Sequence, residues 1–164
     1  MADGYPLIPD DVPDMFRAAM RRLAASVSIV VAKGENGPVG MAATSITSLT
    51  VDPPAVLVCV HRTTSLHALL EPTAPLSVNL LSRDQQDVSM AFGGRMPHDQ
   101  RFSVGNWVAA ENVLPKLHGA QANLRCVIDA MLAYGTHSIV IARVLHAEVS
   151  ETVAPLIYQD GGYL

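Results

Sequence analysis

The sequence predicts a mainly β protein, an antiparallel barrel with a few peripheral helices. The 11 glycines and 11 prolines divide the 164 residues into short apolar runs, which is typical of many strands joined by tight turns. Six or more of these runs have the length and β-branched content of strands. They do not alternate with helices, as the units of a parallel sheet would.

The first regular element is expected to be an amphipathic helix. Residues 1–12 contain two prolines and several acidic side chains, so we expect a tail or arm there. From Pro13 to about Ala25, apolar residues recur at helical spacing, and the proline suits the first turn. Residues 13–164 are long enough to bury one core and too short for two ordinary domains, which predicts a single domain.

Two strands follow this helix. Residues 27–33 form a β-branched run that predicts a buried strand, and residues 34–38 have the composition of a hairpin turn. The next strand begins at Val39 and runs into four hydroxyl side chains, which are followed by Asp52-Pro53-Pro54. Hydroxyls can donate or accept hydrogen bonds, so residues 40–54 are either an edge strand with its turn or the edge of a ligand site.

The middle of the chain has two places where a polar group interrupts the apolar pattern. Residues 55–61 predict a third strand, and residues 63–65 then offer either an N-cap for a short helix through Leu70 or, with Arg62, a place for an anion. Asn79 stands inside the strand predicted at 76–81. A buried amide needs partners, so it either fixes a neighbouring loop or contacts a ligand.

The second half of the chain is expected to hold a helix, a long loop, two long strands and a final hairpin. The helix is predicted at 84–92, and residues 93–115 lack periodicity, as lids and site walls often do. Two long strands at 120–132 and 138–149 meet around a glycine turn, and a short hairpin ends the chain. His137, after that turn, is either a half-buried structural ring or a side chain projecting into a cavity.

Several functions are excluded or disfavoured by composition and missing motifs. The net charge is −4 and only 11 scattered residues are Lys or Arg, which disfavours nucleic-acid binding. The sequence has no GxGxxG, Walker or GxSxG motif, and its six histidines lie at no metal-ligand spacing. Cys59 and Cys126 stand in separate apolar runs and are expected to be reduced. We expect a cytoplasmic protein without membrane contact, because no signal sequence or long apolar span is present.

A set of short motifs recurs along the chain in a characteristic order. They are Phe16-Arg17-Ala18-Ala19-Met20, residues 40–48, Asp52-Pro53-Pro54, residues 59–65, residues 77–81, Arg101-Phe102, residues 117–120, Gly135-Thr136-His137 and residues 155–163. From about Phe16 to Tyr163, the chain thereby resembles the small flavin reductases of two-component monooxygenases. That family has an FMN-binding split-barrel fold of the antiparallel Greek-key type.

The resemblance implies an NAD(P)H:flavin oxidoreductase. Hydride would pass from NADH or NADPH to FMN or FAD, and the reduced flavin would be released to a partner flavin-dependent monooxygenase. The family's barrels are homodimers, and the low charge of this chain is compatible with a buried apolar interface.

The resemblance also implies roles for individual residues. Thr44, Ser45, Ile46, Thr47 and Ser48 would line the flavin ring and its ribityl chain, with Cys59, Val60 and His61 on the next strand. Ser65, with Arg62 nearby, would approach the phosphate, and Asn79, Leu80, Leu81 and Ser82 would touch the flavin from the other side. Phe102 would cover the pocket. His137 would lie near the nicotinamide as the catalytic residue.

One position departs from the family's motif. The family has an aspartate where this chain has Thr136, so one carboxylate partner of His137 is lost. Two alternatives therefore stay open beside the reductase: a non-catalytic flavin- or haem-binding barrel, which Thr136 slightly favours, and a flavoprotein with permanently bound FMN that acts as an oxygenase or electron carrier.

Overall fold

The computed structural model describes residues 9–110 and 113–164. The elements in chain order are α1 (Val12–Met20), β1 (Ala25–Ser26), β2 (Ser28–Gly34), β3 (Gly37–Ala43), β4 (Ile46–Val51), β5 (Pro54–His61), η1 (His67–Leu69), β6 (Pro75–Leu80), α2 (Gln86–Met90), η2 (Ala91–Arg95), η3 (His98–Ser103), β7 (Trp107–Ala110), β8 (Val113–Leu117), β9 (Ala122–Tyr134), β10 (His137–Val149), β11 (Ile157–Gln159) and β12 (Gly162–Tyr163). Among these, no helix is long and apolar enough to cross a membrane.

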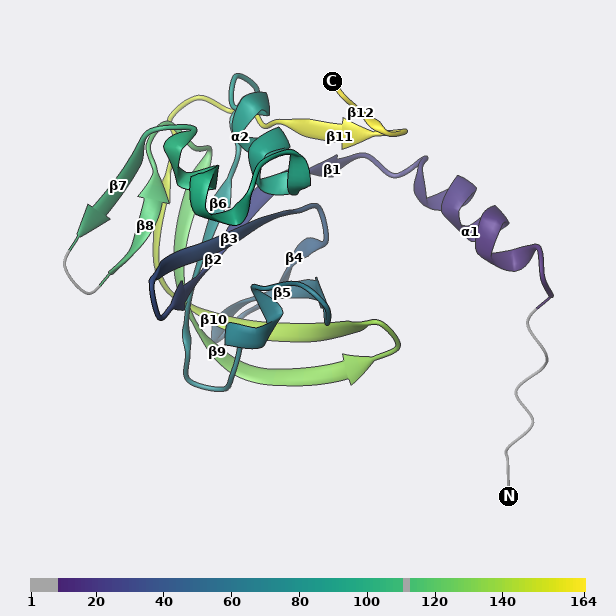
Figure 1. Cartoon of the computed structure of the whole chain (residues 1–164), viewed down its shortest axis with the longest axis horizontal. Coiled ribbons are helices and arrows are strands. Elements are labelled where there is room, and N and C mark those ends of the chain that lie inside the picture. The colour runs from purple at the N-terminus through teal and green to yellow at the C-terminus, as the bar shows by residue number, and fades with distance from the viewer. Residues whose placement is uncertain (1–8, 111–112) are drawn as a thin grey trace.

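A seven-stranded antiparallel sheet forms the body of the protein. Its strand order is β3-β2-β6-β9-β10-β5-β4, and the sheet curls on itself in Figure 1. The two edge strands, β3 and β4, are consecutive in the chain and are joined only by Thr44 and Ser45. The sheet therefore bends back until its edges lie at one short connection, as in a split barrel. The prediction of a mainly β fold with peripheral helices is confirmed.

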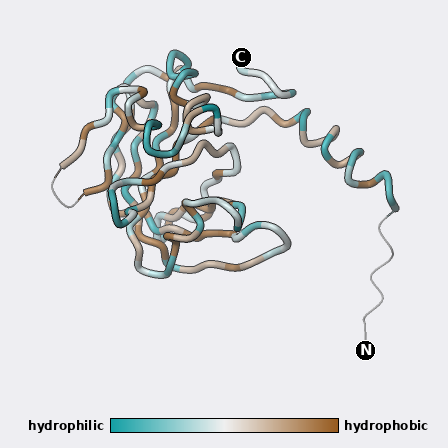
Figure 2. The backbone as a smooth tube through the Cα atoms, in the orientation of Figure 1, coloured by the Kyte–Doolittle hydropathy of each residue, from teal (hydrophilic) through white to brown (hydrophobic). Residues whose placement is uncertain are grey.

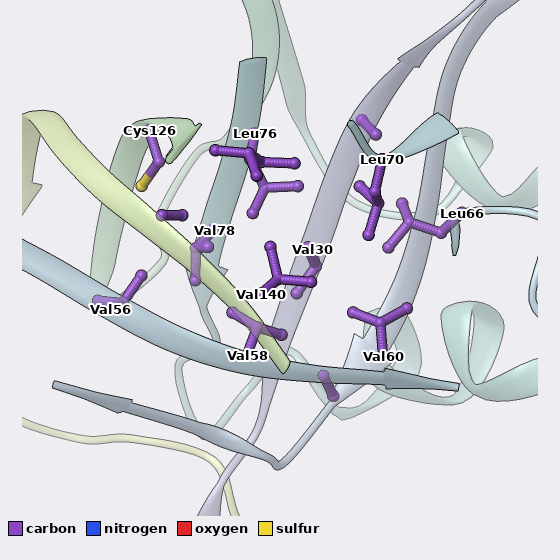
Figure 3. Close-up of a cluster of buried hydrophobic side chains, with 14 residues drawn as sticks. Val30, Val56, Val58, Val60, Leu66, Leu70, Leu76, Val78, Cys126 and Val140 are labelled. Atoms are coloured by element: carbon purple, nitrogen blue, oxygen red, sulfur yellow. The ribbon is translucent and has the colours of Figure 1, made fainter. Parts of the chain in front are cut away.

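The core has two parts that share β2. One part lies inside the curled sheet, where Val30, Val58, Val78 and Val140 meet from four strands (Figure 3). The other lies between the opposite face of β2 and the segment from α2 to β8. Because β2 is covered on both faces, its residues from Ser28 to Ala32 are all buried, which explains the continuous apolar run. The tube in Figure 2 shows this concentration of apolar residues in the strands.

The N-terminal helix lies apart from the barrel. None of the residues of α1 is buried, and Figure 1 shows the helix extending away from the sheet. The chain after it is fixed at the β11–β12 turn, where Arg21 Nε donates to Asp160 Oδ1 at 3.0 Å. The helix ends at Met20, five residues before the predicted end at Ala25. Most of the tail expected at residues 1–12 lies outside the described residues.

Three other predicted elements differ from the structure. The helix expected up to Leu70 is reduced to the 3₁₀ turn η1. The helix expected at 84–92 comprises α2 and the π-helical η2, which extends to Arg95. The prediction of an irregular loop at 93–115 was wrong, because this segment contains η3 and most of the β7–β8 hairpin.

Candidate functional site

The β3–β4 connection, the end of β5 and the start of β10 lie side by side at one end of the barrel. The Cys59 amide donates to the Ser45 carbonyl at 3.2 Å, and Ser45 Oγ donates to the Cys59 carbonyl at 2.9 Å. In the next pair of strands, His61 is the partner of His137. Strand pairing thus brings together the hydroxyl-rich segment, the end of β5 and the histidine motif.

The hydroxyl side chains of this group are available to a ligand. Thr44, Ser45, Thr47 and Ser48 are all exposed. Thr44 also lines a cleft of about 220 Å³, whose other walls include Ser89 and Gly93 near α2 and the two C-terminal tyrosines. The structure confirms the predicted edge strand, because β4 lies at the edge of the sheet. A ligand at its accessible hydroxyls stays a prediction.

Two histidine rings lie in contact beside these hydroxyls. The centroids of His61 and His137 are 4.8 Å apart, and the rings are close to perpendicular, at 77°. The Thr63 amide donates to His61 Nδ1 at 3.2 Å, and Thr63 Oγ1 lies 2.9 Å from the same nitrogen. Thr136 Oγ1 lies 2.9 Å from His137 Nδ1. The hydroxyl that replaces the family's carboxylate thus contacts the ring that the carboxylate would orient.

The turn after β5 contains one capping residue and two exposed polar residues. Thr64 Oγ1 donates to the His61 carbonyl at 2.8 Å and accepts from the His67 amide at 3.2 Å, so Thr64 has the capping role. Arg62 and Ser65 are exposed, and none of the ion pairs among the described residues includes Arg62. An exposed guanidinium beside a hydroxyl fits a phosphate group.

The Asn79 amide is used inside the protein. Asn79 is fully buried; its Nδ2 donates to the Ile29 carbonyl at 3.2 Å, and its Oδ1 accepts from the Leu117 amide at 2.9 Å. The structure shows that the Asn79 side chain fixes the neighbouring segment at Leu117, which was one of the two expectations for this residue. A flavin contact through the Asn79 side chain stays a prediction, since both ends of the amide already have internal partners in this structure.

The three residues after Asn79 are also tied into the fold. Leu81 is fully buried in the core, and a flavin contact of this residue stays a prediction. Ser82 Oγ donates to the Gly119 carbonyl at 2.6 Å. Contacts of the flavin with Leu80 and Ser82 stay predictions.

Phe102 belongs to an aromatic cluster rather than to an irregular lid. Its ring centroid is 5.0 Å from that of Phe92 and 4.9 Å from that of Trp107. The preceding Arg101 is buried, donates to the Gly40 carbonyl at 3.0 Å, and has its pKa lowered by this burial. Arg101 thus fixes η3 against β3. A covering role for Phe102 stays a prediction.

Two residues at this end of the barrel were missed by the sequence analysis. His98 on η3 reaches Ser65, with 3.4 Å between Nδ1 and Oγ, although 33 residues separate them and no local pattern signals the contact. Thr63 was considered only for an N-cap or an anion site, and its contact with His61 was missed, although its spacing of two residues from His61 was a usable signal. Among the described residues, no group of three or more His, Cys, Asp or Glu side chains is arranged to hold a metal ion.

Comparisons with known proteins agree along almost the whole chain. The family described as "Flavin reductase like domain" matches residues 20–164. The reductase component of the FADH(2)-dependent resorcinol hydroxylase of Rhizobium sp. (strain MTP-10005) is 38% identical over 159 residues, which cover 96% of this chain and 89% of that protein. The FMN reductase (NADH) RutF of Stutzerimonas stutzeri (strain A1501) is 35% identical over 158 residues, covering 96% and 88% of the two chains.

Solved structures give the same result. The NADH:FAD oxidoreductase SgcE6 of Streptomyces globisporus superposes with a TM-score of 0.86 at 26% identity, over 98% of this chain and 96% of that one. BorF, the flavin reductase component of a bacterial two-component tryptophan halogenase, superposes with a TM-score of 0.82 at 31% identity, over 93% and 96%. This chain belongs to the flavin reductase-like family.

Proposed function

We propose that this protein is an NADH:flavin oxidoreductase that supplies reduced flavin to a partner monooxygenase. The relatives named above are FMN reductases that use NADH and reductase components of two-component systems. The observation that carries the proposal is the cluster formed by Ser45 before β4, Cys59 and His61 on β5, and His137 on β10. This cluster places accessible hydroxyls next to two imidazoles and near Arg62, which has no ion-pair partner among the described residues.

The residues present fit a flavin and a dinucleotide. The hydroxyls of residues 44–48 would hold the flavin ring and ribityl chain, Arg62 and Ser65 would bind its phosphate, and His137 would contact the nicotinamide. The hydride transfer itself is chemistry that the two bound molecules supply. The task of the protein is to bind and align them, so no nucleophile or paired carboxylate is needed.

His137 has a polar partner at position 136 in spite of the threonine replacement. The hydroxyl lies 2.9 Å from His137 Nδ1, which is hydrogen-bond distance. This contact supports the reductase over a non-catalytic binding protein, the alternative that the loss of the carboxylate favoured.

Steady-state oxidation of NADH and NADPH with FMN, FAD and riboflavin tests the proposal. We expect turnover with NADH and at least one flavin, and a purified protein without yellow colour, since a flavin that is delivered to a partner must dissociate. Absence of turnover with every pair would remove the reductase function. A yellow protein that retains its flavin through gel filtration would favour the permanently bound alternative.

We further propose that the protein is a homodimer. The helix α1 presents Met15, Phe16 and Met20 to solvent, and the barrel exposes Leu132 on β9 and Leu145 on β10. Surfaces of this kind indicate an interface, and a second copy is the occupant that the family suggests. Light scattering at micromolar concentration is expected to give twice the mass of the chain, whereas a monomer would refute the proposed dimer.

The two free cysteines are compatible with a location in the reducing cytoplasm.

A further inference from the structure

We propose that Thr63 fixes His61 in the tautomer with its proton on Nε2, and that this N–H donates a hydrogen bond to the nicotinamide dinucleotide bound beside His137. The proposal rests on the proposed function, since it assigns a second residue to the dinucleotide. It gives His61 a role different from that of a residue lining the flavin pocket.

The tautomer follows from the backbone. A peptide N–H can only donate, and the Thr63 amide points at His61 Nδ1 from 3.2 Å. His61 Nδ1 must therefore accept, and a neutral imidazole that accepts at Nδ1 carries its proton on Nε2. The Thr63 hydroxyl, 2.9 Å from the same nitrogen, can serve as a second donor. A neutral histidine ring can generally exchange between two tautomers, but the contact with the Thr63 amide holds the His61 ring in the Nε2–H tautomer.

The Nε2–H of His61 is left without a partner inside the chain. Among the described residues it has no hydrogen bond, and the ring is only half-buried. A polar group at a partly enclosed position favours a ligand partner. No carboxylate forms an ion pair with His61 or His137 in the described part of the chain, so the acceptor would come from the bound molecule.

The position of the ring selects the dinucleotide as that molecule. His61 and His137 are partners across β5 and β10, and their rings are in edge-to-face contact with centroids 4.8 Å apart. A nicotinamide that reaches His137 is therefore also within reach of His61. The acceptor would be the carboxamide oxygen or a phosphate oxygen of the dinucleotide.

Two substitutions distinguish the acceptor role of His61 Nδ1 from the donor role of Nε2. His61→Asn keeps an acceptor near the Nδ1 position for the Thr63 amide but removes the distal donor, whereas His61→Gln carries an N–H near the Nε2 position. We expect His61→Asn to raise the KM for NADH about three- to tenfold, which is the effect of one lost hydrogen bond, and to change the KM for flavin less than the KM for NADH. His61→Gln should recover most of this loss. Equal losses in both variants, or none in His61→Asn, would overturn the proposal.

Reduced nicotinamide riboside distinguishes the two possible acceptors. It lacks the adenosine and both phosphate groups, so an effect of His61→Asn that persists with it assigns the bond to the nicotinamide end. An effect that is lost assigns the bond to the diphosphate. If NADH itself shows no difference between wild type and His61→Asn, neither assignment stands.

Nuclear magnetic resonance gives a readout that does not need turnover. In ¹⁵N-histidine-labelled wild-type protein, with His61→Asn used for assignment, we expect His61 to show an unprotonated Nδ1 and a protonated Nε2, and we expect Nε2 to shift when NAD⁺ is added. The opposite tautomer, or no shift with saturating NAD⁺, would overturn the proposal. Absence of turnover in wild type, with the tautomer and the shift present, would instead refute the reductase function alone.

Discussion

Replacing Asn79 by alanine tests whether this residue supports the fold or contacts the flavin. The substitution removes the hydrogen bonds to Ile29, Ser77 and Leu117 and leaves the Leu117 amide buried without its acceptor. Each lost bond contributes about 1 kcal/mol, and a buried unpaired donor costs about 1–3 kcal/mol. With partial relaxation of the site, we expect the free energy of unfolding to fall by about 2–4 kcal/mol.

Urea unfolding at a fixed protein concentration measures this change. For a slope of about 2 kcal/mol/M, the midpoint should fall by roughly 1–2 M with the slope unchanged. The KM for flavin, measured well below the unfolding transition, should stay within about twofold. A loss below about 0.5 kcal/mol, together with a KM for flavin raised tenfold or more, would refute the reasoning and restore Asn79 as a flavin contact.

The neighbouring strand offers a matched control for this experiment. Asn123 on β9 is the cross-strand partner of Asn79, and its Oδ1 is buried without a hydrogen-bond partner among the described residues. Truncating a side chain whose acceptor is already unsatisfied loses little. Asn123→Ala is therefore expected to change stability by less than about 1 kcal/mol, although it removes the same atoms from an adjacent position.

Three further predictions concern the site, a thiol and a close contact. Arg62→Ala should raise the KM for FMN about tenfold or more and leave that for riboflavin unchanged, because a charged hydrogen bond to phosphate is lost; equal effects in the two steady-state assays would contradict this. In Cys59→Ser protein, the remaining thiol of Cys126, whose pKa burial raises to about 12, should react with a disulfide reagent at pH 8 only after unfolding; fast labelling of the folded protein would contradict it. Gly40→Ala should lower Tm by several degrees in a thermal melt, since a Cβ there would lie 2.6 Å from the Phe92 ring; an unchanged Tm would show that the ring moves freely.

Local sequence patterns were sufficient for most of the strands but not for the elements that depend on distant contacts. The run at β2 was recognised because both of its faces are covered by apolar groups. The hairpin β7–β8 was missed because Pro115 interrupts the second strand, and proline is accepted there only because this small sheet has no further strand beside it. The early end of α1 was missed because apolar spacing continues to Leu23, while Arg21 is held by Asp160 at the other end of the chain.

The candidate site, like the fold, was predictable in its local features but not in its long-range contacts. Its residue types could be identified from the sequence, since hydroxyls before a double proline and a histidine after a glycine turn are local features. Their proximity could not, because His61 and His137 meet only through the pairing of β5 with β10. Both expectations for Asn79 were compatible with the sequence, and the contact with the Leu117 amide, 38 residues away, supports the role of fixing a neighbouring segment.

The two histidines of the site differ in how firmly their protons are placed. At His61 the partner of Nδ1 is a peptide N–H, which allows a single neutral tautomer. At His137 the partner is the Thr136 hydroxyl, which can donate or accept, so the ring can carry its proton on either nitrogen. A carboxylate at position 136 would accept only, and would add negative charge beside the place proposed for an anionic dinucleotide. The replacement by threonine thus keeps a contact to the ring, removes that charge, and leaves His61 as the ring with a fixed donor.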